Sequence, residues 1–111
     1  MKIDHPLKKD YQLNYQSLIG QENTVFYRGR ITNKNQIELP HFWPELIEET
    51  SISVHLTPIG AHQDIIVKRI GQNRVWLQAK GGFPIDCYYF VMGERRDVSR
   101  IIPEELLDTT D

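Results

Sequence analysis

Cysteine is nearly absent from this chain: Cys87 is the single one among 111 residues, which excludes a disulfide within the chain. It stands in the run IDCYYFV, where a free cysteine typically packs as a small apolar residue. A reactive thiol needs a nearby cation or a helix N-terminus, and a zinc site needs further ligands at set spacings. Because the sequence offers neither beside Cys87, we expect this residue to be buried and unreactive.

Long apolar runs are missing as well. No stretch approaches the roughly 18 consecutive apolar residues of a membrane span. The opening residues, MKIDHPLKKDYQLNYQ, contain no apolar core of the signal-peptide type. The sequence therefore predicts a protein that is made in the cytoplasm, does not leave it through a signal peptide and does not insert into a membrane.

A basic excess is also lacking, since 13 Lys and Arg residues face 15 Asp and Glu residues. Binding to nucleic acid through phosphate neutralisation needs clustered cations. Here the cations form only isolated pairs, at Lys8-Lys9, Lys68-Arg69 and Arg95-Arg96. We expect a surface of mixed sign and no nucleic-acid partner.

Catalytic signatures are absent too. The chain has no P-loop, no G-x-S-x-G, no H-E-x-x-H and no G-x-G-x-x-G motif. Its four histidines, His5, His41, His55 and His62, do not stand two or four residues from one another. We expect a protein that is not an enzyme, with no catalytic residue, no metal site and no cofactor.

What the chain does contain is a series of short segments with alternating apolar and polar residues, most of them closed by glycine or proline. The pattern predicts an all-β domain, a small antiparallel sandwich or barrel-like fold. We expect one hairpin between residues 24–32 and 35–39 and a second across residues 70–74. Pro44 suits the first turn of a helix, which predicts one short helix near residues 41–49.

Three regions differ in composition. Residues 1–23 are polar and predict an extended N-terminal arm, residues 24–100 form the β-domain, and residues 101–111 read as an acidic C-terminal tail. In the arm, Tyr11, Leu13 and Tyr15 alternate as in a strand that adds to an open sheet edge. The alternative is a terminus that docks on nothing.

One predicted strand is apolar on both sides. Its first face carries Ile85, Cys87, Tyr89 and Val91, and its second face carries Tyr88, Phe90 and Met92. Such a strand is buried on both faces, either inside a sandwich or across a subunit interface. We name Tyr88, Phe90 and Met92 as an assembly interface, together with His55. If His55 points to a symmetry axis, assembly is sensitive to mildly acidic pH.

Trp76 is the candidate ligand contact. It alternates with Arg74 and Gln78, so the three side chains share one face of a strand. An aromatic ring between hydrogen-bonding side chains is suited to stack on a sugar. The alternative is that Trp76 packs against a neighbouring side chain.

Three sequence blocks resemble a known family: L-P-x-x-W-x-x-L, S-I-S-V-x-L-T-P-I-G and P-I-D-C-Y-Y-x-V-x-G-E-R-R-D. In this order they resemble a small β-domain of virion structural and tail-fibre proteins of tailed bacteriophages, especially marine, cyanophage-like viruses. The resemblance spans roughly residues 24–100, and it assigns Leu39, Pro40, Trp43 and Leu46 to a helical plug. The chain departs from that family in having no fibre shaft and no chaperone domain.

The resemblance implies a structural protein of the virion, in the tail fibre, baseplate or neck, that assembles as a homotrimer. Its partners are then copies of itself and other phage virion proteins. The alternative is a receptor-binding or glycan-binding module of a phage tail, whose partner is a host surface glycan. Location in the virion follows from either alternative.

Overall fold

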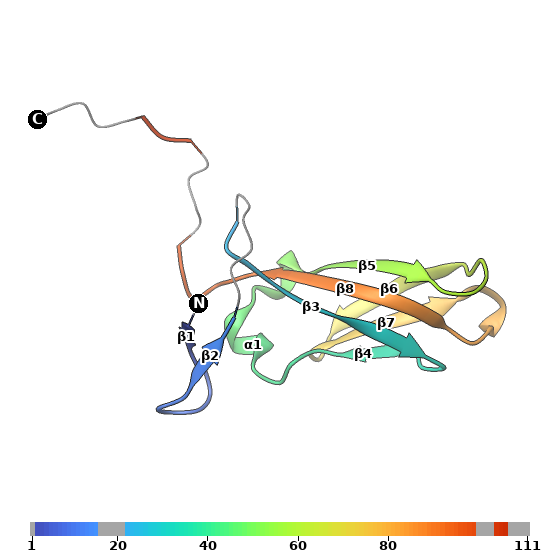
Figure 1. Ribbon diagram of the computed structural model, residues 1–111, viewed down its shortest axis with the longest axis horizontal. Coiled ribbons are helices and arrows are strands. Elements are labelled where there is room, and N and C mark those ends of the chain that lie inside the picture. Colours follow the sequence, from blue (N-terminus) through green and yellow to red (C-terminus); the bar gives the residue numbers. More distant parts are fainter. Residues whose placement is uncertain (1, 16–21, 100–103, 107–111) are drawn as a thin grey trace, which may run out of the picture.

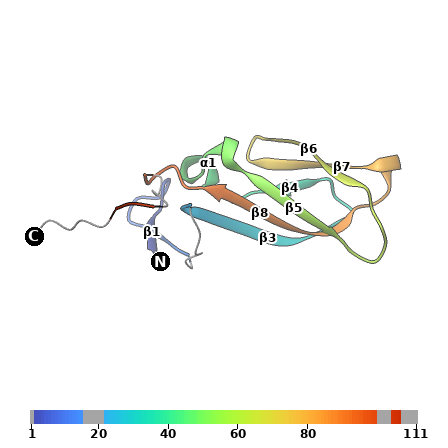
Figure 2. The ribbon, with the colours of Figure 1, turned by 90° about the horizontal axis from the view of Figure 1, so that it is seen from above.

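The computed structural model describes residues 2–15, 22–99 and 104–106, and its body is a sandwich of two antiparallel sheets (Figure 1). The first sheet has the order β3-β8-β5, with β3 (Thr24–Thr32), β8 (Asp86–Glu94) and β5 (Ser53–Pro58). The second has the order β4-β7-β6, with β4 (Gln36–Glu38), β7 (Arg74–Ala79) and β6 (Ile65–Gly71). Figure 2 shows the two sheets as separate layers. The predicted all-β fold is confirmed, and it is a sandwich.

The core lies between the sheets and follows the alternation of side chains along the strands. In β7, the side chains of Val75 and Leu77 are buried, while that of Gln78, on the opposite face of the strand, is exposed. In β8, the side chains of Cys87 and Val91 lie on the same, inner face of the strand and are fully buried. The other buried apolar side chains are Ile3, Val25, Ile31, Ile37, Leu39, Trp43, Leu46, Ile47 and Ile85. One apolar face per strand therefore builds a single core, as the period of two requires.

The expected hairpin between residues 24–32 and 35–39 is wrong. β3 pairs along its whole length with β8, and β4 pairs with β7 in the other sheet. Asn33 turns the chain with a left-handed φ of 56°, and its backbone N–H donates to the Ile85 carbonyl at 2.7 Å. The turn formers thus reverse the chain, but they carry it across the sandwich instead of back along the same sheet.

The second expected hairpin is confirmed, between β6 and β7. Gln72 and Asn73 both adopt positive φ, 53° and 56°, which defines the two-residue turn that matches strand twist. The Asn73 side-chain amide donates to the carbonyls of Leu39 and Pro40, at 3.1 and 2.9 Å. This turn therefore also holds the segment that leads into the helix.

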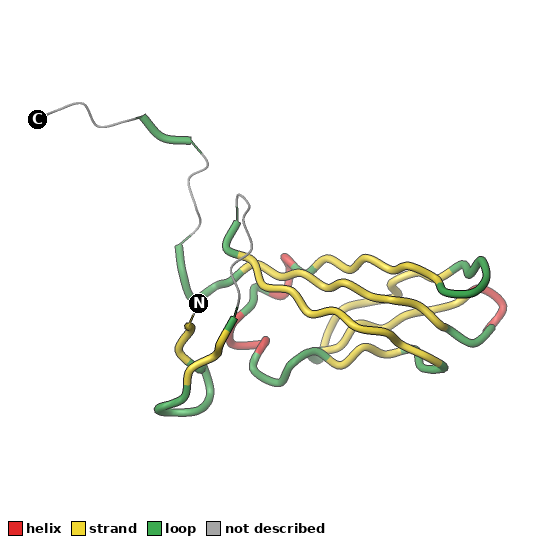
Figure 3. Tube along the Cα trace, in the orientation of Figure 1, coloured by secondary structure: helices red, strands yellow, loops and turns green. Residues whose placement is uncertain are grey.

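The expected short helix is present as α1 (Trp43–Leu46), followed by the 3-10 turn η1 (Glu49–Ser51). Pro44 stands in the first turn of α1, where a missing N–H breaks no helical hydrogen bond. α1 and η1 lie at one end of the sandwich, and the turn η2 (Lys80–Gly82) lies at the other (Figure 3). Trp43 and Leu46 are each 1% exposed, so α1 closes its end of the core.

The N-terminal residues form a hairpin, β1 (Lys2–Asp4) with β2 (Gln12–Asn14), instead of a single extended strand. It lies beside α1 at the end of the sandwich (Figure 1). Ile3 pairs with Leu13 and is 3% exposed, so the hairpin pairs with itself and adds no strand to either main sheet in the described residues. Of the expected acidic tail, residues 101–111, only 104–106 are described.

The loop of this hairpin depends on a neutral histidine. Nδ1 of His5 accepts hydrogen bonds from the backbone N–H groups of Leu7 and Lys8, at 3.1 and 2.9 Å. Partial burial, then the charge of Lys8 and then His41, lowers the pKa of His5. A lowered pKa means that folding favours the neutral ring, so this contribution is complete above about pH 6.5 and is lost as the pH falls.

We therefore expect the Leu7 and Lys8 amide resonances to shift on acidification, with a midpoint below about pH 6.5. The measurement is a pH series of amide spectra of the labelled protein. His5→Asn is the matched control, because an asparagine side chain keeps an acceptor that does not titrate. A midpoint above 6.5, or an equal response in the control, would contradict the assignment.

None of the helices in the described part of the chain has the length and apolar character that a membrane span needs.

Candidate functional site

The outer face of the β3-β8-β5 sheet carries a group of large apolar side chains. We call Phe26, Tyr88, Phe90 and Met92 the aromatic face. Tyr88 is 55% exposed and Phe26 39% exposed, while Phe90 and Met92 are half-buried. The rings of Phe26 and Phe90 stack with centroids 5.1 Å apart and an interplanar angle of 11°. The sandwich thus covers only the inner side of β8 and leaves this side open to solvent.

Strand pairing brings the predicted interface residues together. Phe90 lies between Arg28 of β3 and His55 of β5, so the exposed His55 side chain borders the aromatic face. Tyr88 lies between Arg30 and Thr57 in the same way. The four residues predicted as an interface therefore share one surface. Phe26 was missed, because only the pairing of β3 with β8 places it there.

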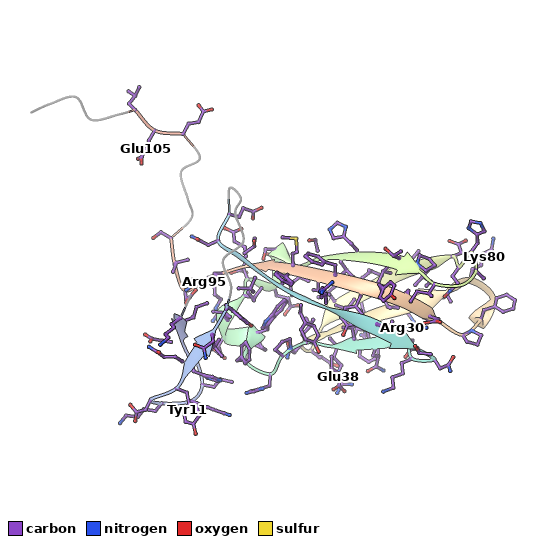
Figure 4. All side chains as sticks on the ribbon, viewed as in Figure 1. Tyr11, Arg30, Glu38, Lys80, Arg95 and Glu105 are labelled. Carbon is purple, nitrogen blue, oxygen red and sulfur yellow. The ribbon has the colours of Figure 1, made fainter. Side chains whose placement is uncertain are left out.

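Arg30 marks one border of this surface (Figure 4). Its guanidinium forms two parallel hydrogen bonds to the Asp86 carboxylate, at 3.0 and 2.9 Å, and Thr32 Oγ1 also donates to Asp86. The hydrogen bond from Arg30 lowers the pKa of Asp86, and the same bond raises the pKa of Arg30. An exposed pair of this kind adds little stability, so its main effect is to hold both side chains in place.

Trp76 lies on the outer face of the other sheet, between Gln36 of β4 and Arg69 of β6. The Arg69 guanidinium carbon lies 4.3 Å from the centre of the indole ring, a cation–π contact. Trp76 therefore packs against a neighbour, as the alternative prediction had it. The ring is nevertheless half-buried rather than buried, and it lines a groove.

Arg74 does not join Trp76 in this groove. Its guanidinium donates to Oε1 of Gln36 at 2.7 Å and lies 3.6 Å from the Glu38 carboxylate. Gln78, in contrast, is exposed and lines the groove beside Trp76. Of the three predicted ligand contacts, two come together and the third is held by β4.

The groove, which we call the β7 groove, has a volume of about 880 Å³. Its side chains with hydrogen-bonding, charged or aromatic groups include Lys68, Arg69, Trp76, Gln78, Lys80 and Phe83. Lys80 lies at the end of the sandwich opposite the N-terminal hairpin (Figure 4). The sequence shows the pair Lys68-Arg69, but not that a break in strand register lies there and that both residues line this groove.

Cys87 is fully buried, and burial, followed by the charge of Asp86, raises the pKa of its thiol. The predicted burial is confirmed, and the thiolate that a nucleophile or metal ligand needs is disfavoured. Residues 2–15, 22–99 and 104–106 contain no group of three or more His, Cys, Asp or Glu side chains placed to hold a metal ion.

Comparisons with models of known protein families, with curated proteins and with solved structures find no match to this chain. What the structure itself defines is a small antiparallel β-sandwich with an N-terminal hairpin, an aromatic face on one sheet and a cationic groove on the other.

Proposed function

We propose that this chain is a structural protein of a tailed-bacteriophage virion, a component of the tail fibre, baseplate or neck, and that it acts by self-assembly as a homotrimer. The three sequence blocks that resemble virion proteins support the proposal. They correspond to α1 with its flanks, to β5 with its following turn, and to β8. Copies of the chain and other virion proteins are then its partners, and the virion is its location.

The aromatic face is the observation that carries self-assembly. Contiguous exposed aromatic side chains on a small soluble domain typically mark a contact surface. Covering the exposed part of these side chains contributes about 25 cal/mol per Å² of apolar surface removed from water. Closed symmetry covers the same patch on every copy, and it also removes exposed sheet edges such as those of β3 and β5. The aromatic face is therefore the proposed interface, with His55 at its border.

Light scattering on a sizing column tests this proposal. We expect a mass three times the 13.0 kDa of the chain, independent of concentration at neutral pH. Tyr88→Lys places a charge on the aromatic face next to Arg30, and it is expected to yield monomers.

Ile66→Lys is the matched control for that experiment. Ile66 is 56% exposed, nearly the same as Tyr88, but it belongs to β6 on the other sheet. We expect this variant to remain trimeric. A wild-type monomer at every concentration, or a trimer that tolerates Tyr88→Lys, would exclude the aromatic face as the interface.

A second candidate function is a receptor-binding or glycan-binding module of a phage tail. The β7 groove favours it, because Trp76 and Gln78 both line a hollow of the size that ligand sites typically have, roughly 300–1,000 Å³. An indole edge and a side-chain amide suit the apolar and hydroxyl surfaces of a sugar. Binding to a panel of host surface polysaccharides tests this candidate.

A further inference from the structure

We propose that the β7 groove binds an acidic polysaccharide, a chain of sugar rings that carry carboxylate or sulfate groups. The inference rests on the second candidate function and adds to it the charge of the ligand. It also replaces Arg74, which β4 holds, with the cations Lys68, Arg69 and Lys80.

The charge of the groove carries the inference. Lys68, Arg69 and Lys80 line it, and no carboxylate does. Within the described part of the chain, none of these three cations forms an ion pair. The chain as a whole has a formal charge of −2, so this local excess runs against its overall charge. Unpaired cations around one hollow attract an anionic ligand.

A β-bulge produces this arrangement. Val67 pairs with Leu77 on the inner face, but Arg69, not Lys68, pairs with Trp76. Lys68 is the extra residue, so two consecutive cations are both exposed on the outer face. Regular alternation would direct one of them into the core. Bulges commonly occur where a strand has to re-aim a side chain at a site.

Trp76 and Phe83 supply the surfaces on which sugar rings stack. Phe83 is 73% exposed. The indole N–H of Trp76 is buried and has no hydrogen-bond acceptor among the described residues. Buried donors without an acceptor are uncommon in proteins. Arg69 covers the ring. An anionic group that draws Arg69 aside opens the indole and offers its N–H an acceptor oxygen.

The groove stays open because β4 is short. β4 pairs with β7 only from Gln36 to Glu38, opposite Trp76 to Arg74. Beyond the hydrogen bond from Leu77 N–H to the Asn35 carbonyl, no described strand pairs with that edge of β7. Lys80 and Phe83 also line a second hollow, which Asp64 lines as well. The Asp64 carboxylate therefore lies near the β7 groove without lining it.

An acidic polysaccharide fits these features better than single-stranded nucleic acid does. Proteins that bind single strands combine a cationic track along several nucleotides with a row of stacking platforms. Here three cations surround one hollow on a chain with a net negative charge. A short anionic sugar segment matches that extent.

The test is a titration of the full chain, followed by tryptophan fluorescence, with four polymers. Polygalacturonate carries carboxylates, dextran sulfate carries sulfates, dextran is neutral, and oligo-dT is a single-stranded nucleic acid. We expect the two acidic polysaccharides to bind and to change the Trp76 emission. We expect the wild type to bind dextran at least about tenfold more weakly than it binds the acidic polysaccharides. We expect the Arg69→Gln variant to bind the acidic polysaccharides at least about tenfold more weakly than the wild type does.

Lys9→Gln is the matched control, because Lys9 is an exposed cation in the N-terminal hairpin, at the end of the sandwich opposite Lys80, and forms no ion pair in the described residues. We expect it to bind as the wild type does. Equal binding of dextran and the acidic polymers would overturn the inference while leaving glycan binding in place. Tighter binding of oligo-dT, no binding of any polymer, or an unchanged Arg69→Gln variant would overturn the acidic-polysaccharide site itself.

Discussion

Replacing Trp43 with alanine is expected to lower the free energy of unfolding by about 3–5 kcal/mol. The side chain is 1% exposed and meets the ring of Tyr27 edge-on, with centroids 6.4 Å apart. Its indole N–H also donates to the Tyr15 hydroxyl at 3.4 Å, which joins α1 to the segment after the N-terminal hairpin. Since a small domain has only about 5–15 kcal/mol of total stability, much of it would be lost.

Urea denaturation followed by circular dichroism measures this loss, and Trp76→Ala is the control. Trp76 is the other tryptophan of the chain, and its half-buried ring packs on a surface arginine rather than in the core. We expect its removal to cost about 1 kcal/mol or less. Equal losses in the two variants would show that α1 does not close the core in the way described.

Gly93→Ala is expected to cost about 1–3 kcal/mol through overpacking. Gly93 lies opposite Val25 in the β3-β8 ladder, and its inner side is covered by Ile47. A β-carbon at this position would collide with the Cγ2 methyl of Ile47, which is itself 2% exposed. The backbone of Ile47 bridges to Arg95, so the isoleucine has little freedom to withdraw.

The same denaturation experiment separates this collision from a general cost of losing glycine. At Gly71 an added β-carbon meets nothing within 4 Å, so Gly71→Ala is expected to change stability by no more than about 0.5 kcal/mol. Ile47→Ala removes the colliding methyl. We therefore expect the double variant with Gly93→Ala to lose less than the sum of the two single losses. Additive losses would rule out the contact as the cause.

Local sequence patterns predicted those elements whose structure depends on near neighbours. Alternation placed Val75 and Leu77 inward, and Pro44 marked the start of the short helix. The turn at Gln72 and Asn73 joins strands that pair directly. In each case the residues that determine the conformation lie within a few positions of one another.

The errors arose where the deciding partner is distant in the chain. Asn33 signals a turn, but only the pairing of β3 with β8 determines that the chain leaves its sheet there. The candidate site shows the same division. Tyr88 and Phe90 share a face by alternation alone, whereas the bulge that adds Lys68 to the β7 groove depends on the register between β6 and β7.

The central place of β8 in its sheet has a consequence for synthesis on the ribosome. Among the strands that the structure describes, β3 and β5 pair only with β8, which is the last of them to be translated. The β4-β7-β6 sheet contains all its strands once residue 79 has emerged, but the other sheet has none of its ladders until β8 follows. Pairing between distant segments is also slow to form. The nascent chain therefore carries β3 unpaired after residue 32, and β5 unpaired as well after residue 58, until β8 begins at residue 86. Partly made copies with unpaired strands are prone to associate wrongly.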